Sequence, residues 1–155
     1  MAARRDTIEH VTLCELATER LREARALQAA SLHDGALYLA GYVLELALKA
    51  CVCKRLGSSV YPPLLLGDGK LREGFFTHSL TDLIIVAGLT TAFSARIDEV
   101  DGLFGANYNM VIVGGWSEKL RYRPLGTDRA TEAEEFLNAL DDPAHGVFTW
   151  LKTQW

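Results

Sequence analysis

The sequence predicts an all-α protein, and three observations lead to this fold class. Residues 36–56 are apolar on almost every helical face, which is the pattern of a helix buried in a protein core or in a membrane. Elsewhere apolar residues recur at steps of three and four, the period of an amphipathic helix, and no segment alternates as a β-strand does. The 155 residues, 49% apolar and 23% charged, predict one globular domain spanning 1–155.

The first half of the chain is expected to contain two helices. The first covers residues 6–30, and its apolar positions are Ile8, Val11, Leu13, Leu16, Leu21, Ala24, Leu27 and Ala30. A short turn at 31–35 separates it from the apolar helix, which runs to about Leu56. Glycine and proline mark a long irregular connection over 57–77, and such loops in compact domains are often functional or mobile.

A third helix is expected to begin near Thr77 or Ser79. Ser79 and Asp82 match the capping-box pattern, in which the side chain of a serine before the helix accepts a hydrogen bond from a backbone N–H three residues later. Its apolar face is formed by Leu80, Leu83, Ile84 and Ala87. We expect the helix to end at Gly88.

Two further segments follow before a proline. Residues 91–104 are expected to form a weaker helix or a turn. Residues 107–122 are expected to be helical, although the Gly114–Gly115 pair weakens this prediction and allows a close backbone approach. Pro124 ends this helix.

The C-terminal segment predicts two more helices. Thr127 or Asp128 can cap the first, whose apolar face is formed by Ala133, Phe136, Leu137 and Leu140. Asp142 followed by Pro143 has the pattern of an N-cap with proline at the first helical position. The last helix is therefore expected over residues 143–154.

Glu45 and Lys49 separate the core interpretation of the apolar helix from the membrane interpretation. Lying four residues apart with the acid first, they can pair along a helix, and each would cost about 2.5–3.5 kcal/mol in a membrane core. Residues 1–10 also lack the apolar stretch of a secretory signal. We expect a cytoplasmic protein without membrane contact, in which Glu45 and Lys49 form a structural, partly buried ion pair. Arg121 is an alternative partner for the carboxylate, and a role for Glu45 in a site stays open.

Composition excludes several classes of site. The net charge of −4 argues against a surface that binds nucleic acid by charge alone, although a local basic patch remains compatible with it. Cys14, Cys51 and Cys53 lack the spacing of a zinc site, and residues two apart on a helix diverge by about 200°. They are expected to be buried thiols. No glycine-rich phosphate loop is present in a strand-to-helix context. We therefore predict no metal and no cofactor.

The order of four sequence blocks resembles HEPN domains, small helical bundles found mainly in prokaryotes. Residues 38–50, YLAGYVLELALKA, resemble the core helix of that family. Residues 77–83, 116–122 and 144–152 resemble three further blocks in the same order. The resemblance implies an up-and-down bundle of four to six helices that forms a homodimer, with a basic cleft along the dimer axis.

The resemblance also implies two kinds of activity. Many HEPN proteins are metal-independent ribonucleases of toxin–antitoxin or antiviral systems, and these carry an arginine followed four to six residues later by a histidine. Other members lack this motif and bind a nucleotide, RNA or a partner protein, in some cases a nucleotidyltransferase.

Arg72 and His78 are the one formal match to the ribonuclease motif. Histidine has a pKa suited to moving the 2′-OH proton, and the planar fork of an arginine suits the phosphate. Two features argue against the pair: Glu73 adds an anion beside the phosphate site, and the motif precedes the helix where the family carries it. Alternatively, His78 is a helix-start residue whose ring binds a neighbouring backbone group or carboxylate.

Arg121 aligns better with the family's arginine, but no histidine follows it before His145. Lys119, Arg121 and Arg123 either form a nucleotide- or RNA-binding surface together with a second subunit or belong to a solvated face. We therefore predict a homodimeric binding module that has lost catalysis. An active endoribonuclease is the alternative, and a helical dimer for protein contact alone is the third.

Overall fold

The computed structural model describes residues 6–67, 69–99, 102–125 and 129–155. Within these ranges the protein is all-α as predicted, with eight α-helices and one two-stranded pairing. The α-helices are α1 His10–Ala29, α2 His33–Arg55, α3 Lys70–Glu73, α4 Leu80–Val86, α5 Thr90–Ile97, α6 Leu103–Tyr108, α7 Ala130–Asp141 and α8 Val147–Leu151. The remaining elements are β1 Ile8–Glu9, β2 Val60–Tyr61, the 3₁₀-helices η1 Leu64–Leu66 and η3 Glu118–Tyr122, and the π-helix η2 Asn109–Val113.

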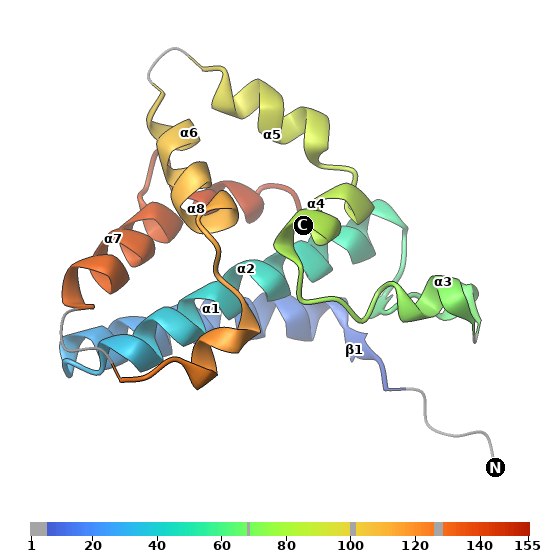
Figure 1. Cartoon of the computed structure of the whole chain (residues 1–155). Helices are drawn as coiled ribbons and strands as arrows, with labels where there is room; N and C mark the ends of the chain where they lie inside the picture. Colours follow the sequence, from blue (N-terminus) through green and yellow to red (C-terminus); the bar gives the residue numbers. More distant parts are fainter. Residues whose placement is uncertain (1–5, 68, 100–101, 126–128) are drawn as a thin grey trace.

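Helices α1 and α2 form a long antiparallel hairpin that is the base of the molecule (Figure 1). The turn between them contains Ser31 at φ 61°. Helix α2 is the one helix in the described part of the chain that is long and apolar enough to cross a membrane, and 72% of its apolar 18-residue window is buried in the protein. Such burial is what the core helix of a globular domain requires.

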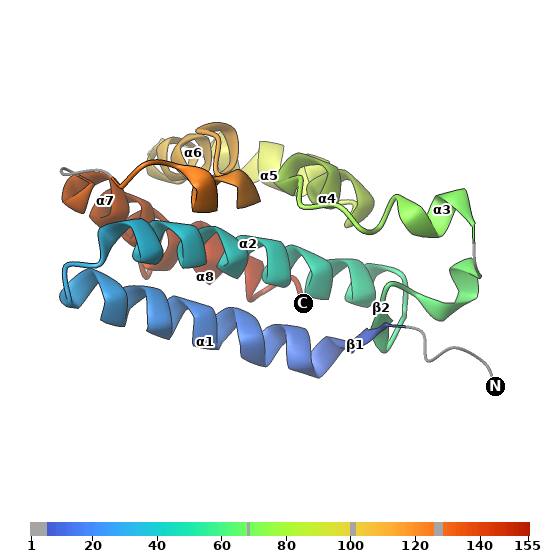
Figure 2. The same ribbon diagram turned by 60° about the horizontal axis from the view of Figure 1, so that its bottom comes forward.

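Helices α4, α5 and α6 lie on the side of α2 opposite α1, whereas α7 contacts both helices of the hairpin (Figure 2). Helices α4, α7 and α8 contact α2 directly. Aromatic packing joins α5 and α6 to α8. Phe93 of α5 and Phe104 of α6 both lie against Trp150 of α8, at 4.5 and 5.7 Å between ring centroids. The core is thus one continuous cluster with α2 at its centre.

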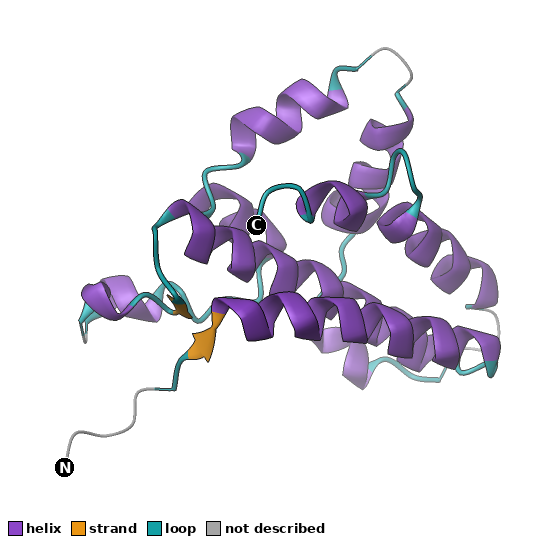
Figure 3. Ribbon diagram, turned by 180° about the vertical axis from the view of Figure 1, so that it is seen from behind, coloured by secondary structure: helices purple, strands orange, loops and turns teal. Residues whose placement is uncertain are grey.

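The connection predicted as irregular over 57–77 contains three short elements, β2, η1 and α3. Strand β2 pairs antiparallel with β1, so that Ile8 lies opposite Tyr61 and Glu9 opposite Val60 (Figure 3). This pairing was not predicted, because a strand of two residues is too short to show the alternation that identifies a strand in sequence.

The predicted helix over 107–122 is wrong as a continuous element. Helix α6 passes into η2, which ends at Val113, and a separate 3₁₀-helix begins after Ser117. Gly115 has φ +92°, a backbone conformation that ends the helical hydrogen bonding and favours glycine. The glycine pair is therefore a break between two elements.

The predicted last helix over 143–154 is also wrong in extent. The Asp142 carboxylate accepts hydrogen bonds from the backbone N–H groups of Ala144 and His145, but residues 143–145 form a turn and α8 starts at Val147. By contrast, the predicted cap of α4 is confirmed, since the Asp82 N–H donates to Ser79 Oγ at 3.2 Å. The predicted caps Thr127 and Asp128 lie outside the described residues.

Candidate functional site

Glu45 is the centre of a polar cluster inside the apolar helix α2. Its side chain is 4% exposed, and Lys49 Nζ lies 2.6 Å from Oε1, one turn further along the helix. His78 Nδ1 lies 3.0 Å from the other oxygen, Oε2. Both carboxylate oxygens are thus occupied, as a buried carboxylate requires.

The contact with Glu45 determines how His78 presents its ring. For Nδ1 to bind a carboxylate oxygen it must carry the proton, so the Nε2 atom of the neutral ring is an acceptor. The His78 side chain is 49% exposed. A buried carboxylate that orients a histidine in this way is the arrangement that general acid–base catalysis uses. The contact also agrees with the alternative interpretation, in which the His78 ring binds a carboxylate.

Arg72, the other half of the formal ribonuclease motif, is placed differently. The residue is 7% exposed, and its guanidinium carbon lies 5.5 Å from the centre of the Phe76 ring. Its Nη1 atom is buried and has no hydrogen-bond partner among the described residues. A guanidinium in this position meets a substrate phosphate only after local opening of the segment that covers it.

Trp116 is fixed against the N-terminal half of α2. Its ring lies 5.1 Å from that of Tyr42 in an edge-on arrangement, and its Nε1–H donates to the Tyr38 carbonyl oxygen at 3.2 Å. Gly41 makes this approach possible, because a Cβ atom there would lie 1.8 Å from the indole. Burial, followed by a hydrogen bond with Tyr38, raises the pKa of the Tyr42 hydroxyl to about 12. The Tyr42 hydroxyl therefore stays protonated at physiological pH.

Lys119, Arg121 and Arg123, the predicted basic surface, are all exposed. Lys119 and Arg121 belong to η3, whereas Arg123 follows its end in an extended conformation. A hydrogen bond with Tyr38 is the main cause that raises the pKa of the Arg121 guanidinium. Arg123 instead reaches α7, where its Nη1 lies 3.4 Å from Glu132 Oε1. Arg121 and Arg123 thus contact different elements, α2 and α7.

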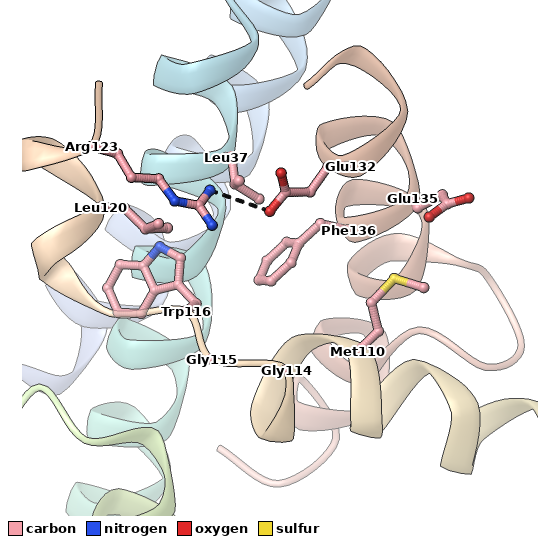
Figure 4. A pocket seen from close by; sticks show the side chains of 10 residues that line it. All are labelled: Leu37, Met110, Gly114, Gly115, Trp116, Leu120, Arg123, Glu132, Glu135 and Phe136. Carbon is pink, nitrogen blue, oxygen red and sulfur yellow. Dashed lines mark hydrogen bonds and ion pairs between the residues drawn. The ribbon is translucent and has the colours of Figure 1, made fainter. Parts of the chain in front are cut away.

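Between α7 and the chain that runs from η2 through η3 lies a cleft of about 380 Å³ (Figure 4). Trp116 and Phe136 form its aromatic walls, and Arg123 and Glu132 face one another across it. The complete lining is Leu37, Met110, Gly114, Gly115, Trp116, Leu120, Arg123, Glu132, Glu135 and Phe136. Its volume is within the range of small-molecule sites, and both polar and apolar groups line it.

The sequence prediction included only Arg123 from this cleft as a site residue. Phe136 was assigned to the apolar face of its helix, and Trp116 was included only in the block over residues 116–122. The two are separated by 20 positions in the sequence, and no local pattern places them opposite one another. The glycine break at Gly114–Gly115 was the available signal, since it was expected to permit a close backbone approach.

The described residues contain neither a group of side chains that could hold a metal ion nor an activated thiol. In these ranges no three His, Cys, Asp or Glu side chains are grouped so that they could hold a metal ion. Cys14, Cys51 and Cys53 are free thiols. Burial raises the pKa of the Cys51 thiol to about 12 and that of Cys53 to about 11. Both therefore remain protonated near pH 7 and are poor nucleophiles.

Comparison with known proteins does not identify a relative: no family model, no curated protein and no solved structure matches the chain.

Proposed function

We propose that the chain is a HEPN-like, homodimeric binding module that takes a nucleotide or a nucleotide unit of RNA. The order of the four resembling blocks supports the family and its up-and-down bundle, and the all-α fold is consistent with both. The family further suggests a cytoplasmic defence or toxin–antitoxin setting with a nucleotidyltransferase-type partner.

The cleft between η3 and α7 is the observation that carries this proposal. A base is a flat ring, and the Trp116 and Phe136 side chains offer it aromatic contact. A phosphate needs a fixed cation at hydrogen-bond distance, and the guanidinium of Arg123 lines the cleft beside Trp116. This local pairing of aromatic walls and one cation does not depend on overall charge, and so it is compatible with the net charge of −4.

Binding is favoured over catalysis by the position of Arg72. Metal-free cleavage of RNA needs a cation against the scissile phosphate. Arg72 is buried against Phe76, whereas the exposed Arg121 and Arg123 contact Tyr38 and Glu132. Among the described residues, none of these three arginines is therefore both accessible and in contact with His78.

Adenosine 5′-monophosphate is the probe for the binding function. We expect calorimetry to detect binding, and Arg123→Ala to weaken it at least tenfold, because hydrogen bonds to a charged group contribute about 1.5–3 kcal/mol. The matched control is Arg121→Ala, which removes the same charge two residues earlier but outside the cleft. Its effect should stay below about fivefold, the upper range for an exposed charge pair. Equal losses in the two variants would place the ligand on an extended surface, and no binding by the wild-type protein would refute the nucleotide function.

An endoribonuclease is the second candidate, and the Glu45–His78 contact favours it. The buried Glu45 carboxylate holds His78 Nδ1, and the half-exposed ring leaves Nε2 free to exchange a proton with a substrate.

Incubation with total RNA in EDTA separates the two functions. We expect no cleavage above the background of the Arg72→Ala, Arg121→Ala and His78→Ala variants, since Arg72 is occluded. Cleavage by the wild-type protein that disappears in His78→Ala and Arg72→Ala would establish the ribonuclease instead. Far-ultraviolet circular dichroism of each variant controls for folding.

A further inference from the structure

An ion pair spans the cleft. Arg123 Nη1 and Glu132 Oε1, 3.4 Å apart, join the chain that follows η3 to α7 above the aromatic walls (Figure 4). The side chains are 42% and 49% exposed, respectively, so water competes with the pair on both sides. Exposed ion pairs of this kind contribute little to stability, and the contact can be exchanged at small cost.

Two carboxylates line the cleft, but only Glu132 meets the cation. Glu135 lies almost one turn further along α7, and its carboxylate points away from Arg123 (Figure 4). No salt bridge of Glu135 is found with any described residue. The structure thus contains a natural comparison between a carboxylate in contact with Arg123 and one of equal charge that is not.

The Glu132 carboxylate occupies the place that a ligand's anionic group needs. Arg123 is the one cation among the residues that line the cleft. A ligand whose ring lies between Trp116 and Phe136 must therefore either leave its charge unpaired or replace Glu132 at the guanidinium. A carboxylate carries one negative charge, whereas a phosphate monoester carries about 1.5–2 at pH 7. The monoester is the stronger partner.

We propose that Glu132 is an internal competitor for Arg123, and that the cleft opens for a ligand that combines a base with a phosphate monoester. This inference rests on the proposed nucleotide-binding function and specifies it further. An internal RNA phosphodiester carries a single charge and has no such advantage over the Glu132 carboxylate. A free mononucleotide and a phosphorylated RNA end share the required chemistry, while a nucleoside and an internal RNA segment lack it.

Calorimetry with adenosine 5′-monophosphate on three variants tests the competition. We expect Glu132→Gln to bind about two- to fivefold more tightly than the wild-type protein, the factor that corresponds to losing one exposed ion pair. The matched control Glu135→Gln removes the same charge from the same helix and cleft, and it should change affinity by less than about 1.5-fold. In an Arg123→Ala background, Glu132→Gln should have no effect, because the contested cation is absent.

The affinities of different ligands identify the source of the phosphate. Adenosine should bind at least about tenfold more weakly than the monophosphate, and Glu132→Gln should leave its affinity unchanged. The dinucleotide ApA should bind like adenosine, and its 5′-phosphorylated form like the monophosphate. A preference of the monophosphate over phosphorylated ApA would assign the cleft to free nucleotides, and the reverse to RNA ends.

Different outcomes of these experiments would refute the inference about Glu132 and the proposed nucleotide-binding function. Equal affinities of Glu132→Gln and Glu135→Gln, with binding still dependent on Arg123, would overturn the competition and leave nucleotide binding intact. Absence of monophosphate binding in all variants would overturn both. Tight binding of unphosphorylated ApA would contradict the requirement for a monoester.

Discussion

Replacement of Glu45 by alanine is expected to lower the free energy of unfolding by about 3–5 kcal/mol, the cost of breaking a buried ion pair from one side. The Lys49 side chain is 14% exposed, so its ammonium would lose its partner in a largely buried position. His78 would lose its contact as well. Urea denaturation at pH 7 measures the change, with similar m-values required for a valid comparison.

Two controls separate the buried pair from the loss of a charge as such. Glu15 lies exposed on α1, and Glu15→Ala should change stability by less than about 0.5 kcal/mol. Exchange of both Glu45 and Lys49 for methionine should restore most of the stability, because no unpaired charge remains. A loss below about 1 kcal/mol in Glu45→Ala would contradict the structural role of the cluster.

Replacement of Gly41 by alanine is expected to destabilise the protein by about 2–3 kcal/mol, even though alanine is the better helix former. The added Cβ would lie 1.8 Å from the Trp116 indole, so the ring must leave its place on α2. Its hydrogen bond to Tyr38 and its edge-on contact with Tyr42 would be lost. Since Trp116 is a wall of the cleft, binding of adenosine 5′-monophosphate should be lost together with stability.

Gly35→Ala is the matched control in the same helix. A Cβ at Gly35 would meet Leu27 Cδ1 at 3.4 Å, an ordinary contact, so this substitution should be neutral or stabilise by up to about 1 kcal/mol. Urea denaturation gives the stabilities, and the indole N–H resonance of Trp116 reports its displacement. Equal stability of the two variants, with an unchanged Trp116 resonance, would be incompatible with the packing described.

The elements predicted correctly from sequence depend on interactions within about one helical turn. The apolar pattern of α2 and the Ser79 cap are of this kind, and the structure contains both. Glu45 and Lys49 are likewise four residues apart, and their proximity on one face follows from the helical period.

The candidate site depends on contacts between distant segments, which a single sequence does not show. His78 meets Glu45 across 33 positions, and Arg123 meets Glu132 across nine positions that pass from one helix to another. The sequence likewise did not show that Arg121 and Arg123, two positions apart, contact different elements, Tyr38 of α2 and Glu132 of α7. The break at Gly115 required a positive φ, which sequence permits but does not demand.

Chemical-shift mapping with adenosine 5′-monophosphate tests most directly whether the cleft between η3 and α7 is the binding site. Titration of ¹⁵N-labelled protein should move the amide resonances of Gly114 and Gly115, the indole N–H of Trp116 and the amide of Phe136, since all four residues line the cleft. In Arg123→Ala these shifts should require at least about tenfold more nucleotide. Shifts confined to residues 72–79 around His78, or no shifts at millimolar nucleotide, would contradict the assignment of this cleft.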